Sequence, residues 1–202
     1  MFIYVCSMVR PKDENKEAAI REKALEMIVE EGFDGLSMGR LAKAANVSPA
    51  TIYLYFENRE DLLNQIFIDI NQKFTENTLE GFDTEMPFEA GMWVQWKNRM
   101  KYTLKYPLHF RFIEQFMHSP QVHALKQKDG AFKKAMGAFF HNCKKRGDIP
   151  DMEVELFWAI AYGPLYGLMR FHLNGRSMMG NEFKLDEVKL RQTFEMAMKG
   201  FK

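Results

Sequence analysis

The sequence predicts an all-α protein with a small N-terminal helical domain joined to a larger helical domain. Apolar residues recur at three- and four-residue spacing along most of the chain, and no segment alternates with the period of two that is typical of strands. Proline and glycine interrupt this pattern at intervals of helical length. Hydrophobic residues make up 47% of the chain and charged residues 27%, as in ordinary globular proteins. We expect the domains to span residues 8–57 and 58–202, with the start of the fourth helix, to about residue 67, packing with the first.

Residues 12–31 are expected to form the first helix. A single apolar stripe runs along this otherwise charged segment, at Ile20, Ala24, Met27 and Ile28. Residues 1–7 are expected to be a loose tail, and Met8 is an alternative start.

A helix-turn-helix pattern follows between residues 37 and 56. Ser37 is placed to cap a short helix whose apolar positions follow the helical period. Asn46 falls where the chain must turn, and asparagine tolerates the left-handed conformation. Ser48 followed by Pro49 is typical of a helix start, so a third helix is expected over 49–56.

The third helix raises the question of what its outward side chains do. Ile52 and Phe56 share one face and can join a core, which leaves Ala50, Tyr53 and Leu54 on the other face. Such a face fits the major groove of DNA, where apolar groups contact thymine methyls and tyrosine hydroxyls reach phosphates. Packing against another part of the chain, or against a protein partner, fits the same spacing. The formal net charge of +1 does not decide between these readings.

A fourth helix is expected from Asn58, with acidic residues in its first turn and an apolar stripe along its length. Further helices are expected at about 87–105, 107–118, 121–146, 151–174 and 186–200, because proline or glycine separates these segments.

The stretch EEGFDGLSMGRLAKAANVSPATIYLYFENREDLL strongly resembles the DNA-binding domain of the TetR/AcrR family of bacterial transcriptional regulators. The shared pattern is a glycine-containing turn, a Ser or Thr cap, LA..AGVS, then T-I-Y-.-.-F and N-[KR]-E-.-L-L. The resemblance covers about 50 residues, roughly a quarter of the chain, from about Ala18 to Phe67. It implies a sequence-specific transcriptional regulator, and a repressor above all.

The resemblance also implies which residues face DNA. Gly39 stands where some members place a base-reading side chain, and Tyr55 replaces a frequent histidine. Lysines on the first helix are added as phosphate contacts, since affinity for DNA depends strongly on such contacts. The expected DNA-binding set is Lys12, Lys16, Ser37, Ser48, Pro49, Ala50, Thr51, Tyr53, Leu54, Tyr55 and Arg59.

For the larger domain the resemblance implies ligand sensing and dimerisation. Helices 151–174 and 186–200 are expected to form a homodimer interface, and a twofold dimer requires a roughly palindromic operator. Aromatic and methionine side chains are candidates for the lining of a pocket for a small apolar or amphipathic effector. For each residue taken alone, an ordinary core position is the stronger interpretation. The candidates are Trp93, Trp96, Met100, Phe112, Phe116, Phe139, Trp158, Tyr162 and Tyr166.

Other function classes find little support in the sequence. The five histidines are scattered, and no HExxH, GxSxG or glycine-rich phosphate loop is present, so we expect neither an enzyme nor a cofactor or metal site. Two distant cysteines favour a reduced, cytoplasmic location. No segment is apolar enough to span a membrane, so we expect no membrane partner. A helical module that binds protein remains the alternative to DNA binding.

Overall fold

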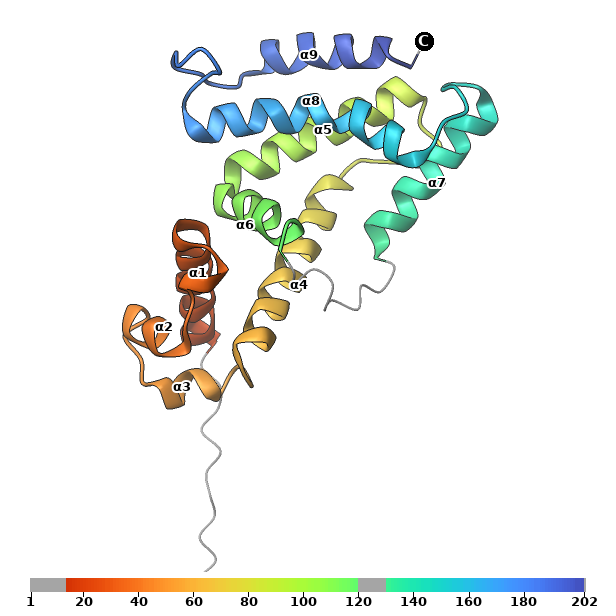
Figure 1. Cartoon of the computed structure of the whole chain (residues 1–202). Helices are drawn as coiled ribbons and strands as arrows, with labels where there is room; N and C mark the ends of the chain where they lie inside the picture. The colour runs from red at the N-terminus through yellow and green to blue at the C-terminus, as the bar shows by residue number, and fades with distance from the viewer. Residues whose placement is uncertain (1–13, 120–129, 202) are drawn as a thin grey trace, which may run out of the picture. The chain divides into compact units, whose positions relative to one another are not determined.

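The computed structural model describes residues 14–119 and 130–201, and the described part of the chain is helical as expected (Figure 1). Its elements are α1 Glu14–Glu31, the 3-10 turn η1 Phe33–Gly35, α2 Met38–Ala44, α3 Pro49–Tyr53, α4 Arg59–Thr78, α5 Phe88–Lys105, α6 Pro107–Met117, α7 Ala131–Arg146, α8 Val154–Asn174 and α9 Glu187–Lys199. Among these residues no helix is long and apolar enough to cross a membrane.

The chain forms two compact units, and two helices belong to both. Unit 1 contains the residues up to Asp69 and a second stretch that begins at Arg111, whereas unit 2 contains residues 70–110 and the C-terminal helices. The contacts therefore divide within α4 and α6. The expected domains 8–57 and 58–202, with the start of the fourth helix to about residue 67 packing with the first, stay a prediction. Sequence patterns mark where helices end, whereas these helices are continuous across the division.

The core of unit 1 is built from the apolar stripes of its helices. Ile20 and Ile28 of α1, Leu41 of α2 and Ile52 of α3 are completely buried. Arg21 links α1 to α4, because its guanidinium lies 2.7 Å from Glu17, one turn before it, and 2.9 Å from Asp69.

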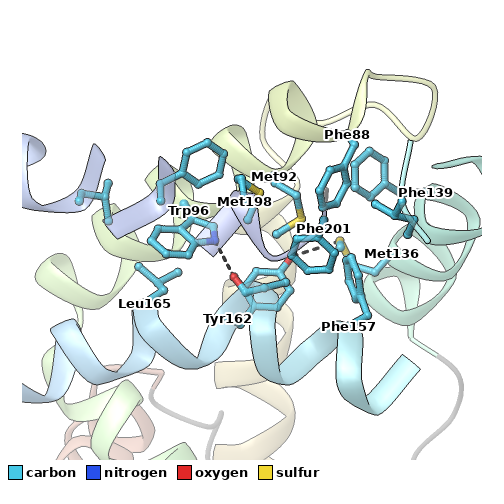
Figure 2. Close-up of a cluster of buried hydrophobic side chains, with 14 of the residues drawn as sticks. Phe88, Met92, Trp96, Met136, Phe139, Phe157, Tyr162, Leu165, Met198 and Phe201 are labelled. Carbon is cyan, nitrogen blue, oxygen red and sulfur yellow. Dashed lines mark hydrogen bonds between the residues drawn. The ribbon is translucent and has the colours of Figure 1, made fainter. Parts of the chain in front are cut away.

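Unit 2 has a larger core formed by α5, α7, α8 and α9 (Figure 2). Trp96 and Tyr162 are its most central large side chains, and the Trp96 indole donates a 2.8 Å hydrogen bond to the Ala161 carbonyl of α8. Phe139 of α7 stacks on Phe88 of α5 at 6.3 Å. Helices α8 and α9 pack side by side along much of their length.

Helix bounds agree with the expected ranges to within a few residues, with two exceptions. The expected helix 121–146 is not continuous, because Gly130 is extended and α7 begins at Ala131; the expected start at residue 121 lies outside the described part. Helix α3 ends at Tyr53 and not at Phe56, because the backbone leaves the helical pattern after one and a half turns.

Candidate nucleic-acid interface

Both short helices of the helix-turn-helix are capped as predicted. The Ser37 hydroxyl accepts a 3.3 Å hydrogen bond from the Arg40 amide at the start of α2. The Ser48 hydroxyl accepts one of 3.1 Å from the Thr51 amide, and Pro49 occupies the first turn of α3. Side-chain capping satisfies amides that have no partner within the helix, which makes such short helices stable.

The turn between the helices depends on a left-handed residue. Asn46 has φ of 53°, the conformation that its position predicted. The Val47 amide then donates a 2.9 Å hydrogen bond back to the Ala42 carbonyl, which closes the end of α2. This turn fixes the direction in which α3 leaves α2.

The residues of α3 and of the turn that follows it divide into a buried and an exposed set, as the helical spacing predicted. Ile52 and Phe56 are fully buried, whereas Tyr53 is 54% and Leu54 is 64% exposed. Ala50 and Pro49 are also exposed. Within unit 1, therefore, this apolar face is not used for packing.

Tyr55 and Thr51 are placed differently from the exposed pair. Tyr55 is half-buried, and its ring lies 6.3 Å from that of Phe56. The Thr51 hydroxyl lies 2.8 Å from the hydroxyl of Ser48, the residue that caps α3. Both side chains support α3 from within the protein, whatever contact their remaining surface makes.

Arg59 has an internal role that the sequence did not reveal. Its guanidinium donates hydrogen bonds to the carbonyl oxygens of Phe33 and Leu36, the latter at 3.0 Å, and its side chain is only 24% exposed. These bonds hold the turn that leads into α2. Arg59 therefore supports the turn from inside the protein, and its expected contact with DNA stays a prediction.

The remaining cations of unit 1 are few. Lys16 lies exposed on α1, and Lys12 lies outside the described residues. Arg40 pairs with Glu31 at 2.7 Å. Lys43, at the end of α2, is exposed and forms no ion pair with the described residues, and the sequence reading passed it over. The sequence could have indicated that Lys43 has no ion-pair partner on its helix, because no acidic residue stands three or four positions from it.

The nine residues proposed to line a ligand pocket fall into separate places. Phe112 and Phe116 belong to unit 1, where the rings of both pack against Phe33. Phe116 also stacks on Phe67, with 4.6 Å between the ring centres. They are therefore core residues of the N-terminal unit and not part of a pocket in unit 2. Their helical stripe predicted burial, but not the unit in which they are buried.

The other seven lie in unit 2 but do not surround one space. Trp96 and Phe139 are fully buried in the core, and Met100 packs against it. Trp93 lies against α9, with its ring 5.0 Å from Phe194, and lines an open depression on the surface.

Trp158, Tyr162 and Tyr166 of α8 gather around a residue that was not predicted, Arg99 of α5. Its side chain is only 1% exposed, and its guanidinium lies 4.1 Å from the centre of the Tyr162 ring. The signal was present in the sequence, because Arg99 falls three residues after Trp96, on the apolar stripe of α5.

Comparison with known proteins agrees with the geometry of unit 1. Residues 20–66 match the family model described as bacterial regulatory proteins, tetR family. An uncharacterised HTH-type transcriptional regulator of Haemophilus influenzae is 27% identical over 135 residues, which are 67% of this chain and 71% of that protein. The fatty acid metabolism regulator protein of Bacillus subtilis is 38% identical over 65 residues, 32% of this chain and 34% of that protein.

The likeness extends to complete structures. The crystal structure of a TetR family transcription regulator from Marinobacter aquaeolei VT8 superposes with a TM-score of 0.77, at 27% identity, over 93% of this chain and 95% of that one. With its capped helix-turn-helix and a C-terminal unit of the same fold, the chain belongs to the TetR family of bacterial transcriptional regulators and is a DNA-binding regulator.

Proposed function

We propose that the protein is a homodimeric repressor that binds a palindromic operator through the exposed face of α3 and leaves it when a small ligand binds unit 2. The observation that carries the DNA-binding part is the exposure of Tyr53 and Leu54 on a helix whose other face is buried. Ala50, Pro49 and Ser48 belong to the same face, and Lys16 and Lys43 supply phosphate contacts. Apolar contact with thymine methyls and hydroxyl contact with phosphate suit these side chains.

The dimer is proposed to form through α8 and α9. Leu156 and Ile160 lie one turn apart on α8 and are 54% and 36% exposed, and Met196 of α9 is 72% exposed. A Cβ atom added to Gly200, which follows α9, would lie 3.2 Å from Ile160, so the exposed side chains of the two helices belong to neighbouring positions. A paired helical surface of this kind suits a bundle of four helices across a twofold axis.

Release by a ligand requires two states of different affinity for DNA. A ligand shifts this equilibrium only when it binds the DNA-incompetent state more tightly. Helix α4 carries residues of both units and is continuous between them, so it is the segment through which we expect the effect to pass. The aromatic residues around Arg99 are the part of unit 2 that we propose for the ligand.

Selection of bound fragments from a random DNA pool tests the DNA-binding part. We expect enrichment of a palindrome by the wild type, and a loss of affinity of about tenfold or more for Leu54→Ala, the scale of one apolar base contact. Leu104→Ala removes another exposed leucine, in α5, and is the matched control. A protein-binding role predicts no enrichment and little salt dependence, whereas affinity for DNA falls steeply with salt.

Sedimentation at micromolar concentration tests the dimer. We expect a dimer for the wild type and a monomer for Ile160→Glu, because a carboxylate without a partner at an apolar interface is costly. Ile68→Glu places the same charge on another exposed isoleucine, in α4, and should leave the mass unchanged. A monomeric wild type would exclude the twofold dimer.

A further inference from the structure

Arg99 is buried without a counter-charge in the described part of the chain. Its Nη1 donates a hydrogen bond to the Tyr166 hydroxyl, but the side-chain nitrogens Nε and Nη2 are buried and have no hydrogen-bond partner. Buried polar groups are nearly always hydrogen-bonded, and a buried cation without an anion carries a large desolvation cost. The described residues therefore leave this cation without a full set of hydrogen-bond partners.

Other partly buried arginines of the protein have hydrogen-bond or ion-pair partners. Arg21, which is half-buried, pairs with Glu17 and Asp69, and Arg146 pairs with Asp148 at 2.9 Å. Arg59 gives its donors to backbone carbonyls. Arg99 is more deeply buried than any of these three, yet among the described residues its side chain donates a hydrogen bond only to the Tyr166 hydroxyl.

The surroundings of Arg99 are five aromatic rings, which we call the Arg99 cage. The guanidinium carbon lies between 4.1 and 5.9 Å from each ring centre. The cage consists of Phe74, Phe132, Trp158, Tyr162 and Tyr166. Ring faces attract a cation, but they accept no strong hydrogen bond in the plane of the guanidinium.

The Tyr162 phenol of the cage does not supply a negative charge. Burial raises the pKa of the Tyr162 hydroxyl to about 12, against the opposing effect of Arg99, so this group is neutral at physiological pH. The Gln95 side-chain oxygen, one turn before Arg99 on α5, is also buried without a hydrogen-bond partner.

The two free nitrogens of Arg99 form one edge of the guanidinium. Nε–H and Nη2–H point in parallel, and this pair is the fork that binds the two oxygens of a carboxylate. Nη1, the nitrogen that is not part of this fork, donates its hydrogen bond to the Tyr166 hydroxyl, which fixes the plane of the guanidinium. Four of the five rings, all except Tyr162, keep part of their surface exposed, whereas Arg99 itself is only 1% exposed.

We propose that the Arg99 cage binds the carboxylate of an organic acid with an apolar body, and that this acid is the effector of the regulator. The fork of Arg99 receives the carboxylate, and the aromatic rings contact the apolar body. The inference rests on the proposed ligand-dependent function, because it assigns a site and a chemical class to that ligand.

The test is calorimetric titration of the full-length protein with two acids and their neutral amides: decanoate with decanamide, and naphthalene-2-carboxylate with naphthalene-2-carboxamide. We expect at least one acid to bind about 30-fold or more tightly than its amide, because only the carboxylate makes two charge-assisted hydrogen bonds. If neither acid binds, or if acid and amide bind equally, the proposal is overturned and the free nitrogens are served by water alone.

Variants identify the residue responsible. Arg99→Lys keeps the charge but loses the fork, and should lower the affinity for the acid by about tenfold or more. Arg99→Gln should also abolish the preference for acid over amide. Arg191→Gln is the matched control, because Arg191 lies 4.4 Å over the Trp93 ring outside the cage. Unchanged acid affinity in a folded Arg99→Lys protein refutes the proposal, and that variant suffices if Arg99→Gln does not fold.

Operator binding, measured separately, distinguishes the two proposals. If the wild type binds its operator and neither acid binds, the Arg99 inference fails and the DNA-binding function stands. If acids bind through Arg99 but no operator is selected, the proposed function fails and the site stands. When both hold, Arg99→Gln should remain on the operator at acid concentrations that release the wild type.

Discussion

Replacement of Arg59 by alanine is expected to loosen the helix-turn-helix from inside. The guanidinium holds the carbonyls of Phe33 and Leu36, and a hydrogen bond from a charged group contributes about 1.5–3 kcal/mol. Since 24% of the side chain remains exposed, we expect the two bonds together to contribute about 2–3 kcal/mol, which is less than their sum of about 3–6 kcal/mol. The cap of α4 is unaffected, because Asn58 accepts the Asp61 amide independently at 2.8 Å.

Arg40→Ala is the matched control for this substitution. Arg40 binds the Gly35 carbonyl in the same turn and pairs with Glu31, but its side chain is 55% exposed. Exposed pairs of this kind contribute about 0–1 kcal/mol. The two variants therefore remove the same chemical group from the same turn at different depths.

Hydrogen exchange of the α2 and α3 amides in the full chain is the assay. A loss of 2–3 kcal/mol corresponds to a fall in protection of about 30-fold to 150-fold for Arg59→Ala, if these amides exchange through opening of unit 1, and less than about fivefold for Arg40→Ala. Tryptophan fluorescence gives an internal reference, because Trp93, Trp96 and Trp158 all lie in unit 2. Unchanged protection in Arg59→Ala, together with lost DNA binding, would refute the internal role and indicate that Arg59 acts by contacting DNA.

Two further predictions concern unit 2. Gly91→Ala should destabilise it by about 1–3 kcal/mol, because the new Cβ would lie 2.6 Å from the Phe139 ring. Gly137→Ala, where no atom lies within 4 Å, should stabilise it by up to about 1 kcal/mol, and equal effects in urea unfolding would contradict this reasoning. Burial, with a contribution from Lys73, lowers the pKa of His109 from 6.5 to about 4, so the unfolded chain takes up more protons between these values. Stability is therefore full above pH 6.5 and falls toward pH 4, by about 1 kcal/mol after solvent screening, and His109→Gln should show a smaller fall.

Local features of the fold were predictable because their causes lie within a few residues. Ser37 and Ser48 cap helices through amides three positions ahead, and Asn46 adopts the left-handed turn that its type allows. The division of α3 into two faces followed from the helical period, whereas the exposure of one face did not, because packing against another part of the chain fits the same spacing. Each of these predictions needed no knowledge of the rest of the chain.

Features that depend on distant partners were not predictable. An apolar stripe shows that Phe112 and Phe116 are buried, but their partner Phe67 is set by the fold of unit 1. The link from Arg59 to Phe33 joins residues 26 positions apart, so spacing gave no sign of it. The position of Arg99 on an apolar stripe was visible, but the absence of an acidic partner became apparent only from the surrounding side chains.

Three places in the protein are arranged against the requirements of folding alone. Leu54 on α3 and Leu156 on α8 remain exposed, although burial of a leucine stabilises a protein by about 1.5–3 kcal/mol, and Arg99 is buried with two free donors. Each place has its own proposed partner: DNA, a second copy of the chain, and an organic acid. Polar substitution at the two leucines, or Arg99→Met in the cage, should therefore leave the free energy of unfolding unchanged or raise it, while the corresponding partner is lost. Loss of stability together with loss of binding would instead mean that the residue serves the fold.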